Sequence, residues 1–85
     1  MQVRVLYFGI LREAAGIPEE QVELDESSTA GDLLRILRAR ASNRDMDSVW
    51  ESLAVAVNRE YASAADTLHE GDEVALLPPV SGGVR

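Results

Sequence analysis

The sequence predicts an α+β domain in which a mixed β-sheet is covered on one face by one main helix. Three observations favour this class. Two short segments near the start alternate polar and apolar residues, a single amphipathic helix pattern follows Thr29, and apolar segments of strand length fill the second half. At 85 residues the chain has the length of one small domain with a modest core.

The first half begins with a predicted β-hairpin. Residues Gln2 to Phe8 are rich in β-branched and aromatic side chains, as strands are. Alternation predicts two faces, with Val3, Val5 and Tyr7 on one and Arg4, Leu6 and Phe8 on the other. Ile10 to Ala15 form a short helical turn that Gly16 ends, because glycine suits the position after a helix and Ile17-Pro18 prevents continuation. Gln21 to Asp25 alternate again, so we expect a second strand antiparallel to the first.

The main helix is predicted from its cap and its apolar stripe. Thr29 and Asp32 have the spacing of a capping box. At 100° per residue the apolar side chains of the next three turns share one stripe, which is made of Ala30, Leu33, Leu34, Leu37 and Ala41. Arg35 and Arg38 face away from it. We expect the helix to cover the sheet and to end near Ser42-Asn43.

The second half is predicted to supply the remaining strands. Asp45 to Ser52 are ambiguous, with one helical turn anchored by Trp50 as one interpretation. Leu53 to Val57 form an apolar run typical of a strand buried on both faces, whereas Tyr61 to Ala65 fit a weak strand or a loop. His69 to Asp72 form a turn in which Gly71 can adopt a positive φ, and Glu73 to Leu77 form the last strand. This order fits a β-grasp fold, but periodicity alone leaves ferredoxin-like arrangements open.

Composition excludes several function classes. With 8 basic and 15 acidic residues the net charge is −7, which disfavours nucleic acids and anionic membranes and favours a basic partner surface. Every basic residue is an arginine, so no lysine can accept an isopeptide bond. The chain has no cysteine for disulfides, thiolate metal sites or sulfur chemistry. We find no signal peptide and no apolar run of membrane-spanning length, and we expect a cytoplasmic protein.

Chemistry within the domain is sparse, so we place the function at the C-terminus. His69 is the only histidine and lies in a predicted turn, where a solvated side chain is the simplest interpretation. The acidic residues around it, Glu70, Asp72 and Glu73, lack the spacing of a calcium loop. No glycine-rich phosphate loop is present. We therefore expect no bound cofactor or metal.

The last residues of the chain, from Pro78 onward, are rich in proline and glycine and are not of the kind that packs into a hydrophobic core. Pro78 and Pro79 end strand pairing and hold the following residues extended. Gly82 and Gly83 have no Cβ and pass where other residues would clash. The segment from Pro79 to Gly83 reaches about 16 Å at roughly 3.3 Å per residue, which is enough to enter a partner's active site.

The sequence resembles the small subunits of molybdopterin synthase. The likeness is carried by residues 71–74 and by the ending Leu76-Leu77-Pro78-Pro79-Val80-Ser81-Gly82-Gly83. It is also carried by Val5-Leu6-Tyr7-Phe8-Gly9, by Leu11-Arg12-Glu13 with Gly16, and by Val57-Asn58. The resemblance implies a β-grasp (ubiquitin-like) fold, with a domain over residues 1–79 and a flexible tail over residues 80–85.

The resemblance also implies a function. The chain would be a sulfur carrier for molybdenum cofactor biosynthesis, and the catalytic groups of the synthase would lie on its large subunit. An E1-like enzyme would use ATP to adenylate the Gly83 carboxylate, and sulfur would replace AMP to leave a thiocarboxylate. Pro79, Val80, Ser81 and Gly82 would then occupy the channel of the large subunit. Phe8, Tyr61 and Leu77 would form the partner interface on the outer face of the sheet.

One departure and three alternatives remain open. Members of the family usually stop at the second glycine, whereas Val84 and Arg85 follow here. We expect a C-terminal peptidase to remove these two residues, unless they are an artificial addition. The first alternative function is sulfur donation to thiamin, cysteine or tungsten cofactor synthesis. The others are a ubiquitin-like protein modifier and an interaction module with an inert tail.

Overall fold

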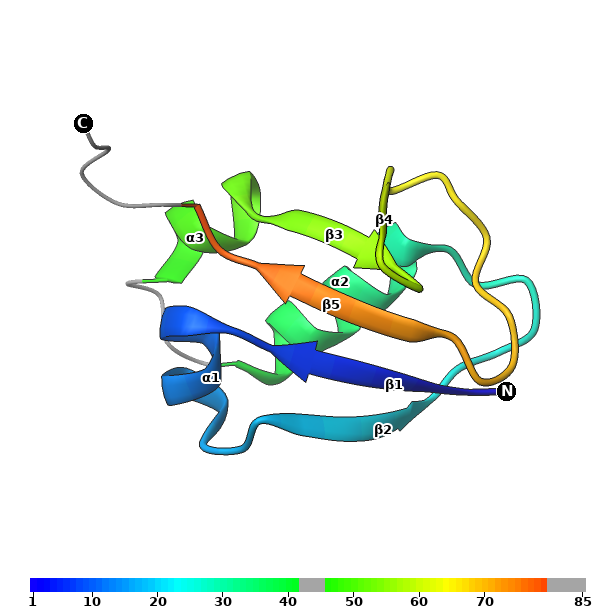
Figure 1. Cartoon of the computed structure of the whole chain (residues 1–85), viewed down its shortest axis with the longest axis horizontal. Helices are drawn as coiled ribbons and strands as arrows, with labels where there is room; N and C mark the ends of the chain where they lie inside the picture. Colours follow the sequence, from blue (N-terminus) through cyan, green and yellow to red (C-terminus); the bar gives the residue numbers. More distant parts are fainter. Residues whose placement is uncertain (42–45, 80–85) are drawn as a thin grey trace.

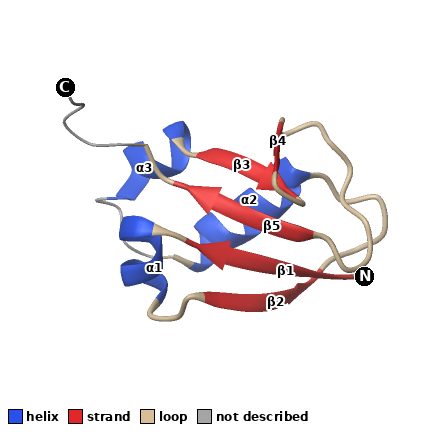
Figure 2. Ribbon diagram, viewed as in Figure 1, coloured by secondary structure: helices blue, strands red, loops and turns tan. Residues whose placement is uncertain are grey.

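The structure is a computed structural model that describes residues 1–41 and 46–79. A five-stranded sheet in the order β2-β1-β5-β3-β4 has the long helix α2 across one face (Figure 1). Figure 2 shows the short helices α1 and α3 at the end of the sheet where β1 and β5 finish. The elements in chain order are β1 Gln2–Tyr7, α1 Gly9–Ala15, β2 Glu19–Glu23, α2 Ala30–Arg40, α3 Asp47–Ser52, β3 Ala54–Val57, β4 Glu60–Ala62 and β5 Glu73–Leu77.

The sheet is mixed, as predicted. β1 is antiparallel to β2, with Val3 opposite Val22, and parallel to β5, with Val5 opposite Val74. β3 is antiparallel to both β5 and β4. An initial antiparallel hairpin, one main crossover helix and a parallel central pair make the β-grasp fold. The fold prediction is therefore confirmed, and the ferredoxin-like alternative is excluded.

The hairpin starts earlier than its sequence pattern indicates. The second strand was predicted from Gln21 to Asp25, but β2 covers Glu19–Glu23. The Tyr7 N–H donates to the Pro18 carbonyl at 2.8 Å, so pairing resumes as soon as the proline has turned the chain. The first strand ends one residue before the predicted Phe8, which becomes the N-cap of α1. Gly16 ends α1 with a φ of 78°, as predicted.

The capping box of α2 is confirmed. The Asp32 N–H donates to the Thr29 hydroxyl at 3.2 Å, and the Thr29 N–H donates to the Asp32 carboxylate at 2.9 Å. The predicted stripe is buried at Ala30, Leu33 and Leu37 and partly buried at Leu34. Ala41 is exposed, and its place in the stripe was wrong. The helix ends at Arg40 and the backbone of Ala41 is extended, so Ala41 no longer follows the helical period that the stripe assumed. The end predicted near Ser42-Asn43 lies outside the described residues.

The core lies between α2 and the sheet. Its most deeply buried large side chains are Val3, Val5, Leu33, Leu68, Val74 and Leu76. The ambiguous segment before β3 contains α3, whose Trp50 packs partly buried against this core. Arg38 of α2 forms ion pairs with two residues of α3, Asp47 at 3.2 Å and Glu51 at 3.3 Å, and so links the two helices.

The second half differs from the predictions in two strands. The apolar run from Leu53 was expected to be buried on both faces, and Val55 and Ala56 are buried, but Ala54 is exposed. The weak strand expected over Tyr61 to Ala65 is β4, which ends at Ala62. The Asp66 carboxylate accepts the Ser63 N–H at 2.9 Å, and this local turn ends the strand.

The turn between β3 and β4 was not predicted because it contains no glycine. Asn58 and Arg59 both have positive φ values, 52° and 72°, as a two-residue hairpin turn of type I′ requires. Asn58 is held there by hydrogen bonds. Its side-chain amide donates to Asp72 at 3.0 Å and accepts the Glu73 N–H at 3.0 Å. Gly71 has the predicted positive φ, 82°.

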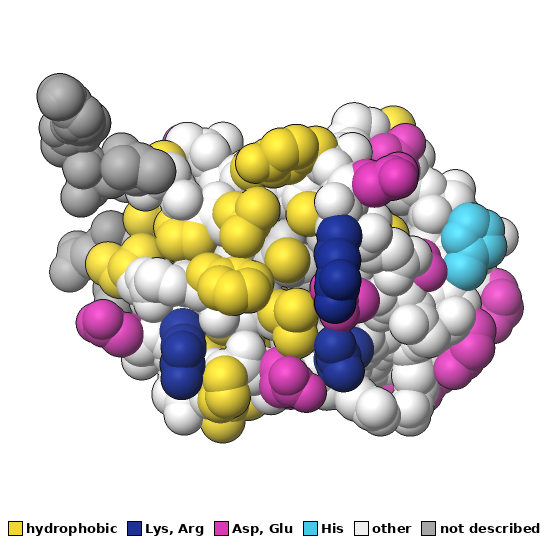
Figure 3. Space-filling model, in the orientation of Figure 1, with side chains coloured by type: hydrophobic (Ala, Val, Ile, Leu, Met, Phe, Trp, Pro, Cys, Tyr) yellow, Lys and Arg dark blue, Asp and Glu magenta, His cyan; other side chains and the backbone are white. Residues whose placement is uncertain are grey.

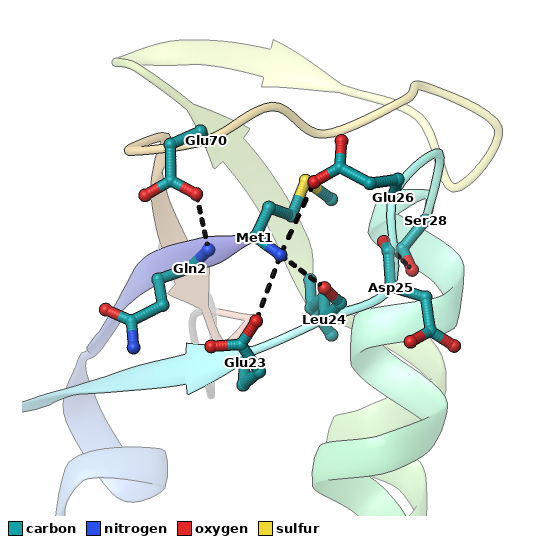
Figure 4. A network of polar contacts seen from close by, with 8 residues as sticks. All are labelled: Met1, Gln2, Glu23, Leu24, Asp25, Glu26, Ser28 and Glu70. Carbon is teal, nitrogen blue, oxygen red and sulfur yellow. Dashed lines mark hydrogen bonds and ion pairs between the residues drawn. The ribbon is translucent and has the colours of Figure 1, made fainter.

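A polar network closes the end of the molecule where β1 starts (Figure 4). The Met1 amino group donates to the Glu23 carboxylate at 3.0 Å and to the Leu24 carbonyl at 2.7 Å. The Gln2 N–H donates to the Glu70 carboxylate at 2.9 Å. These contacts join β1 to β2 and to the turn that precedes β5. None of the helices in the described part of the chain has the length and apolarity that a membrane crossing requires.

Candidate functional site

The face of the sheet opposite α2 carries a row of apolar side chains across four strands. Leu6 of β1 lies beside Ala75 of β5, Ala75 beside Ala56 of β3, and Ala56 beside Tyr61 of β4. Their strand neighbours Val5, Tyr7, Val55, Val74 and Leu76 are buried. Because successive side chains of a strand point to opposite faces, the row itself faces away from α2. Its small members Ala56 and Ala75 are buried between their larger neighbours, whereas Tyr61 is exposed.

A second apolar row lies at the end where β1 and β5 finish. Leu77 is paired with Ala54, and the parallel register that joins Tyr7 to Leu76 places Phe8 next to Leu77. Phe8 keeps an extended backbone with φ −127° and ψ 155°, so the alternation continues through it. We call the two rows together the apolar patch, which consists of Leu6, Phe8, Ala54, Ala56, Tyr61, Ala75 and Leu77.

The structure therefore brings the three predicted interface residues to one face. Tyr61 is 81% exposed and Phe8 43% exposed, while Leu77 is half-buried. Exposed aromatic side chains grouped with aliphatic ones are typical of protein docking surfaces. Their role as an interface stays a prediction.

Charge is distributed unevenly over this face. Beyond the apolar rows, Arg4 and Glu73 lie side by side and form an ion pair at 2.8 Å. Figure 3 shows hydrophobic side chains gathered over the half of the face where β1 and β5 end, with the histidine and several acidic side chains towards the opposite end. The apolar patch thus adjoins the position from which the C-terminal segment leaves the sheet.

The structure places only the start of the predicted tail. Pro78 is half-buried and Pro79 is exposed, directly after β5. Val80, Ser81, Gly82 and Gly83 lie outside the described residues, as do Val84 and Arg85. The division into a domain over residues 1–79 and a tail over residues 80–85 stays a prediction.

The side chains around His69 form a polar turn. His69 is exposed, and its Nδ1 lies 3.9 Å from an Asp72 oxygen. The Asp72 carboxylate also accepts the His69 N–H at 2.8 Å, which stabilises the turn before β5. In residues 1–41 and 46–79 no three histidine, aspartate or glutamate side chains are grouped as a metal site would need.

One polar cluster was missed by the sequence analysis. The Tyr7 hydroxyl donates to Glu20 at 2.5 Å, and Arg40 donates to the same carboxylate at 2.9 Å. The cluster borders a cavity of about 380 Å³ between α1, α2 and α3, on the opposite side of the sheet from the apolar patch. No sequence signal pointed to it, because the predicted second strand began after Glu20.

Electrostatics keep this cluster in one protonation state near neutral pH. Burial and the hydrogen bond to Glu20 raise the pKa of the Tyr7 hydroxyl, which therefore remains a donor. Burial alone would raise the pKa of Glu20, but the hydrogen bonds from Arg40 and Tyr7 outweigh it and lower that pKa. Each group has a partner, so the cluster joins β1, β2 and α2 and offers no reactive group.

Comparison with known proteins extends these observations along the chain. The model of the ThiS family matches residues 5–83. The molybdopterin synthase sulfur carrier subunit of Chlamydomonas reinhardtii is 42% identical over 85 residues, which cover 98% of this chain and 100% of that relative. The family match thus ends at Gly83 and leaves out Val84 and Arg85.

Solved structures show the same fold. The crystal structure of SAMP1 from Haloferax volcanii has a TM-score of 0.81 at 32% identity and covers 98% of this chain and 100% of its own. A chain from the complex of subunits 1 and 2 of molybdopterin-converting factor from Helicobacter pylori has a TM-score of 0.68 at 26% identity, with coverages of 98% and 100%. Both similarities extend over nearly the whole length of each chain.

Proposed function

Because this chain belongs to the ThiS family, we propose that it is a sulfur carrier, the small subunit of a molybdopterin synthase. The observation that carries the proposal is the 42% identity to a sulfur carrier subunit of that enzyme over its entire length. The structure adds an apolar patch next to the position where the C-terminal segment leaves the sheet, which supports the proposal. Together these features suit a protein that delivers a group on its C-terminus to a partner's active site.

The chemistry assigned to this chain needs only the carboxyl group of Gly83. An E1-like enzyme transfers AMP from ATP to that carboxylate, with release of pyrophosphate, and so creates a good leaving group. A persulfide sulfur attacks the acyl carbon and AMP departs, after which a thiol cleaves the sulfur–sulfur bond and leaves a thiocarboxylate. The chain has no cysteine, so the persulfide and the thiol belong to other proteins.

The proposed partner for sulfur transfer is a large synthase subunit that binds the apolar patch. The similar Helicobacter pylori chain lies in a complex of two subunits, which supports a partner of this kind. Phe8, Tyr61 and Leu77 would be covered in the complex, and the segment from Pro79 to Gly83 would enter the partner's channel. The catalytic groups that act on the pterin precursor would come from the large subunit.

Maturation forms the third part of the proposal. Adenylation requires a free carboxyl group on Gly83, but Val84 and Arg85 follow it in the sequence. A β-branched side chain and a permanently charged guanidinium do not fit a channel shaped for glycine. We therefore assign to a C-terminal peptidase the removal of both residues. We place these steps in the cytoplasm, because a cysteine-free chain needs no oxidising compartment.

A ubiquitin-like modifier is the second candidate function. SAMP1 is named small archaeal modifier protein 1, and its 32% identity and TM-score of 0.81 favour this alternative. A modifier would use the same adenylated glycine but transfer it to a lysine of a target protein. Without lysines of its own it would attach singly, because no isopeptide chain can grow on it.

The test compares two proteins, one ending at Gly83 and one ending at Arg85. Each is given an E1-like enzyme, ATP and a sulfur source, and its intact mass is measured. We expect only the shorter protein to exchange one carboxyl oxygen for sulfur and then to pass the sulfur to the pterin precursor in the presence of the large subunit. Thiocarboxylation of Arg85 at a comparable rate would contradict the maturation step. Lysine adducts in lysate without sulfur transfer would favour the modifier.

A further inference from the structure

Gly9 lies two residues after the end of β1, and the ring of Pro78, the first residue after β5, lies where a side chain on Gly9 would be. β1 and β5 are parallel neighbours, so both chains leave the sheet at the same end. Gly9 begins α1 with a φ of 55°. A Cβ atom on Gly9 would lie 3.0 Å from Cγ of Pro78 and 3.9 Å from its Cδ. The ring of Pro78 therefore occupies space that any other residue at position 9 would fill.

Pro78 lies at the start of the C-terminal segment, so a change in its orientation would change the direction in which that segment leaves the sheet. Pro78 and Pro79 have fixed φ angles, and each restricts the residue before it to extended conformations. A proline pair behaves as a semi-rigid spacer. The orientation of the Pro78 ring thus sets the direction of the chain through Pro79.

We propose that Gly9 is a positioning residue, which admits the Pro78 ring and thereby sets the direction in which the C-terminal segment leaves the sheet. The inference rests on the proposed function, because it concerns delivery of Gly83 to a partner bound at the apolar patch. Phe8 and Leu77 of that patch directly precede Gly9 and Pro78. One pair of adjacent strands then supplies both the docking side chains and the direction of the tail.

The size of the effect follows from geometry. The segment from Pro79 to Gly83 would reach about 16 Å if it is extended, as the sequence predicts, and a small rotation at Pro79 would then move the reacting group by several ångströms. A misplacement of about 1 Å can reduce a rate on the order of a hundredfold. Gly82 and Gly83 can adopt many backbone conformations and can partly correct the position of the reacting group. We therefore expect the rate of sulfur transfer to fall about tenfold.

The critical variant is Gly9→Asn. Asparagine tolerates a positive φ better than most residues, so the variant adds a side chain against Pro78 with little backbone strain. Gly16→Asn is the matched control, because Gly16 has a φ of 78° at the other end of α1 and no atom lies within 4 Å of its added Cβ. Pro78→Ala removes the ring itself and provides a second variant that does not alter α1.

The first measurement is independent of sulfur chemistry. Because the chain has no cysteine, spin labels can be placed at Val80→Cys and at Ala39→Cys, which is exposed on α2. We expect Gly9→Asn and Pro78→Ala to shift or broaden the distance distribution between the labels, and Gly16→Asn to leave it unchanged. Identical distributions in all four proteins would overturn the proposal, whatever the protein does in the cell.

The second measurement uses chains ending at Gly83 that have been thiocarboxylated, together with the large subunit. We expect Gly9→Asn to lower the transfer rate at saturating partner about tenfold, with a dissociation constant close to that of the wild type. In the Pro78→Ala background the Gly9 substitution should have no further effect, because the ring it meets is gone. Wild-type rates in both single variants, or an equal loss in Gly16→Asn, would overturn the proposal. A wild-type chain that passes no sulfur would instead contradict the proposed function, and the label distances would still decide the role of Gly9.

Discussion

The two ends of the central strand pair have opposite surface chemistry. Hydrogen bonds and charges gather at the end where β1 and β5 start. The Met1 amino group donates to Glu23, the Gln2 N–H donates to Glu70, and the His69 N–H donates to Asp72. Where β1 and β5 finish, Phe8 is left 43% exposed beside Leu77. On the face of the sheet opposite α2, polar contacts thus lie at one end, and apolar surface that no other element covers in residues 1–41 and 46–79 lies at the other. The cluster of Tyr7, Glu20 and Arg40 lies on the opposite side of the sheet. Substitutions at the two ends should affect different properties.

The largest effect is expected for a charge placed in the apolar patch. In Phe8→Asp or Tyr61→Asp a carboxylate would be buried unpaired on docking, which costs several kcal/mol and weakens the complex on the order of a hundredfold or more. In the free protein both positions are solvated, so the melting temperature should stay near that of the wild type. Calorimetric titration with the large subunit and circular dichroism measure the two properties.

The control for the charged patch is Gln21→Asp, an exposed substitution on the polar part of the sheet. It adds the same charge and should leave the complex intact. If it weakens binding as much as Phe8→Asp does, general repulsion and not the apolar patch governs docking.

The next effect concerns the tail glycines. Gly82→Ala and Gly83→Ala add one methyl group each, which should hinder passage through a narrow channel and lower single-turnover sulfur transfer roughly ten- to a hundredfold. The melting temperature should not change, because neither residue belongs to the predicted domain. Transfer at the wild-type rate by both variants would rule out a channel shaped for glycine.

A smaller effect is expected at the cap of α2, where a substitution should lower stability and leave sulfur transfer unchanged. Thr29→Ala removes the acceptor of the Asp32 N–H and should lower the free energy of unfolding by about 1 kcal/mol. For a domain of this size that corresponds to a fall in melting temperature of roughly 4–8 °C. Thr29→Ser keeps the hydroxyl and should retain most of the stability, and both variants should transfer sulfur normally at temperatures where they are folded. An unchanged melting curve for Thr29→Ala would contradict the energetic role of the cap.

The smallest effect is a change in acid sensitivity. The pKa of Glu20 is lowered in the folded protein because the hydrogen bonds from Arg40 and Tyr7 outweigh the effect of burial. A carboxyl group with a depressed pKa stabilises the fold above its unfolded value, near 4.5, and this stabilisation is lost as the pH falls through the folded value. The unfolding free energy of Glu20→Gln should therefore decline less steeply below pH 4.5 than that of the wild type. Parallel denaturation curves at several pH values would contradict this role of Glu20.

The features that were predicted correctly depend on neighbours in sequence. Both hydrogen bonds between Thr29 and Asp32 lie within one helical turn, and Gly16 and Gly71 each signal a positive φ by their own identity. The placement of Phe8 and Leu77 on one face needed only strand alternation.

The features that were missed depend on contacts between distant residues. The Gly9–Pro78 contact and the cluster of Tyr7, Glu20 and Arg40 join separate elements, and no local pattern encodes them. The turn at Asn58 and Arg59 was missed for another reason. Asn58 is held at its positive φ by donating to Asp72 and by accepting the Glu73 N–H, and the turn lacks glycine, the usual signal.

The central position of β5 has a consequence for biosynthesis. β5 lies between β1 and β3 in the sheet, yet of the five strands it is the last to emerge from the ribosome. The β1–β2 hairpin and α2 can begin to form early, but the parallel pairing of β1 with β5 must wait for the whole domain to be synthesised, and such long-range closure is slow. A chain that ends before Leu77 lacks part of the central strand, so its sheet cannot form completely and we expect proteases to degrade it. A chain that has folded therefore already carries the start of the C-terminal segment beside the apolar patch.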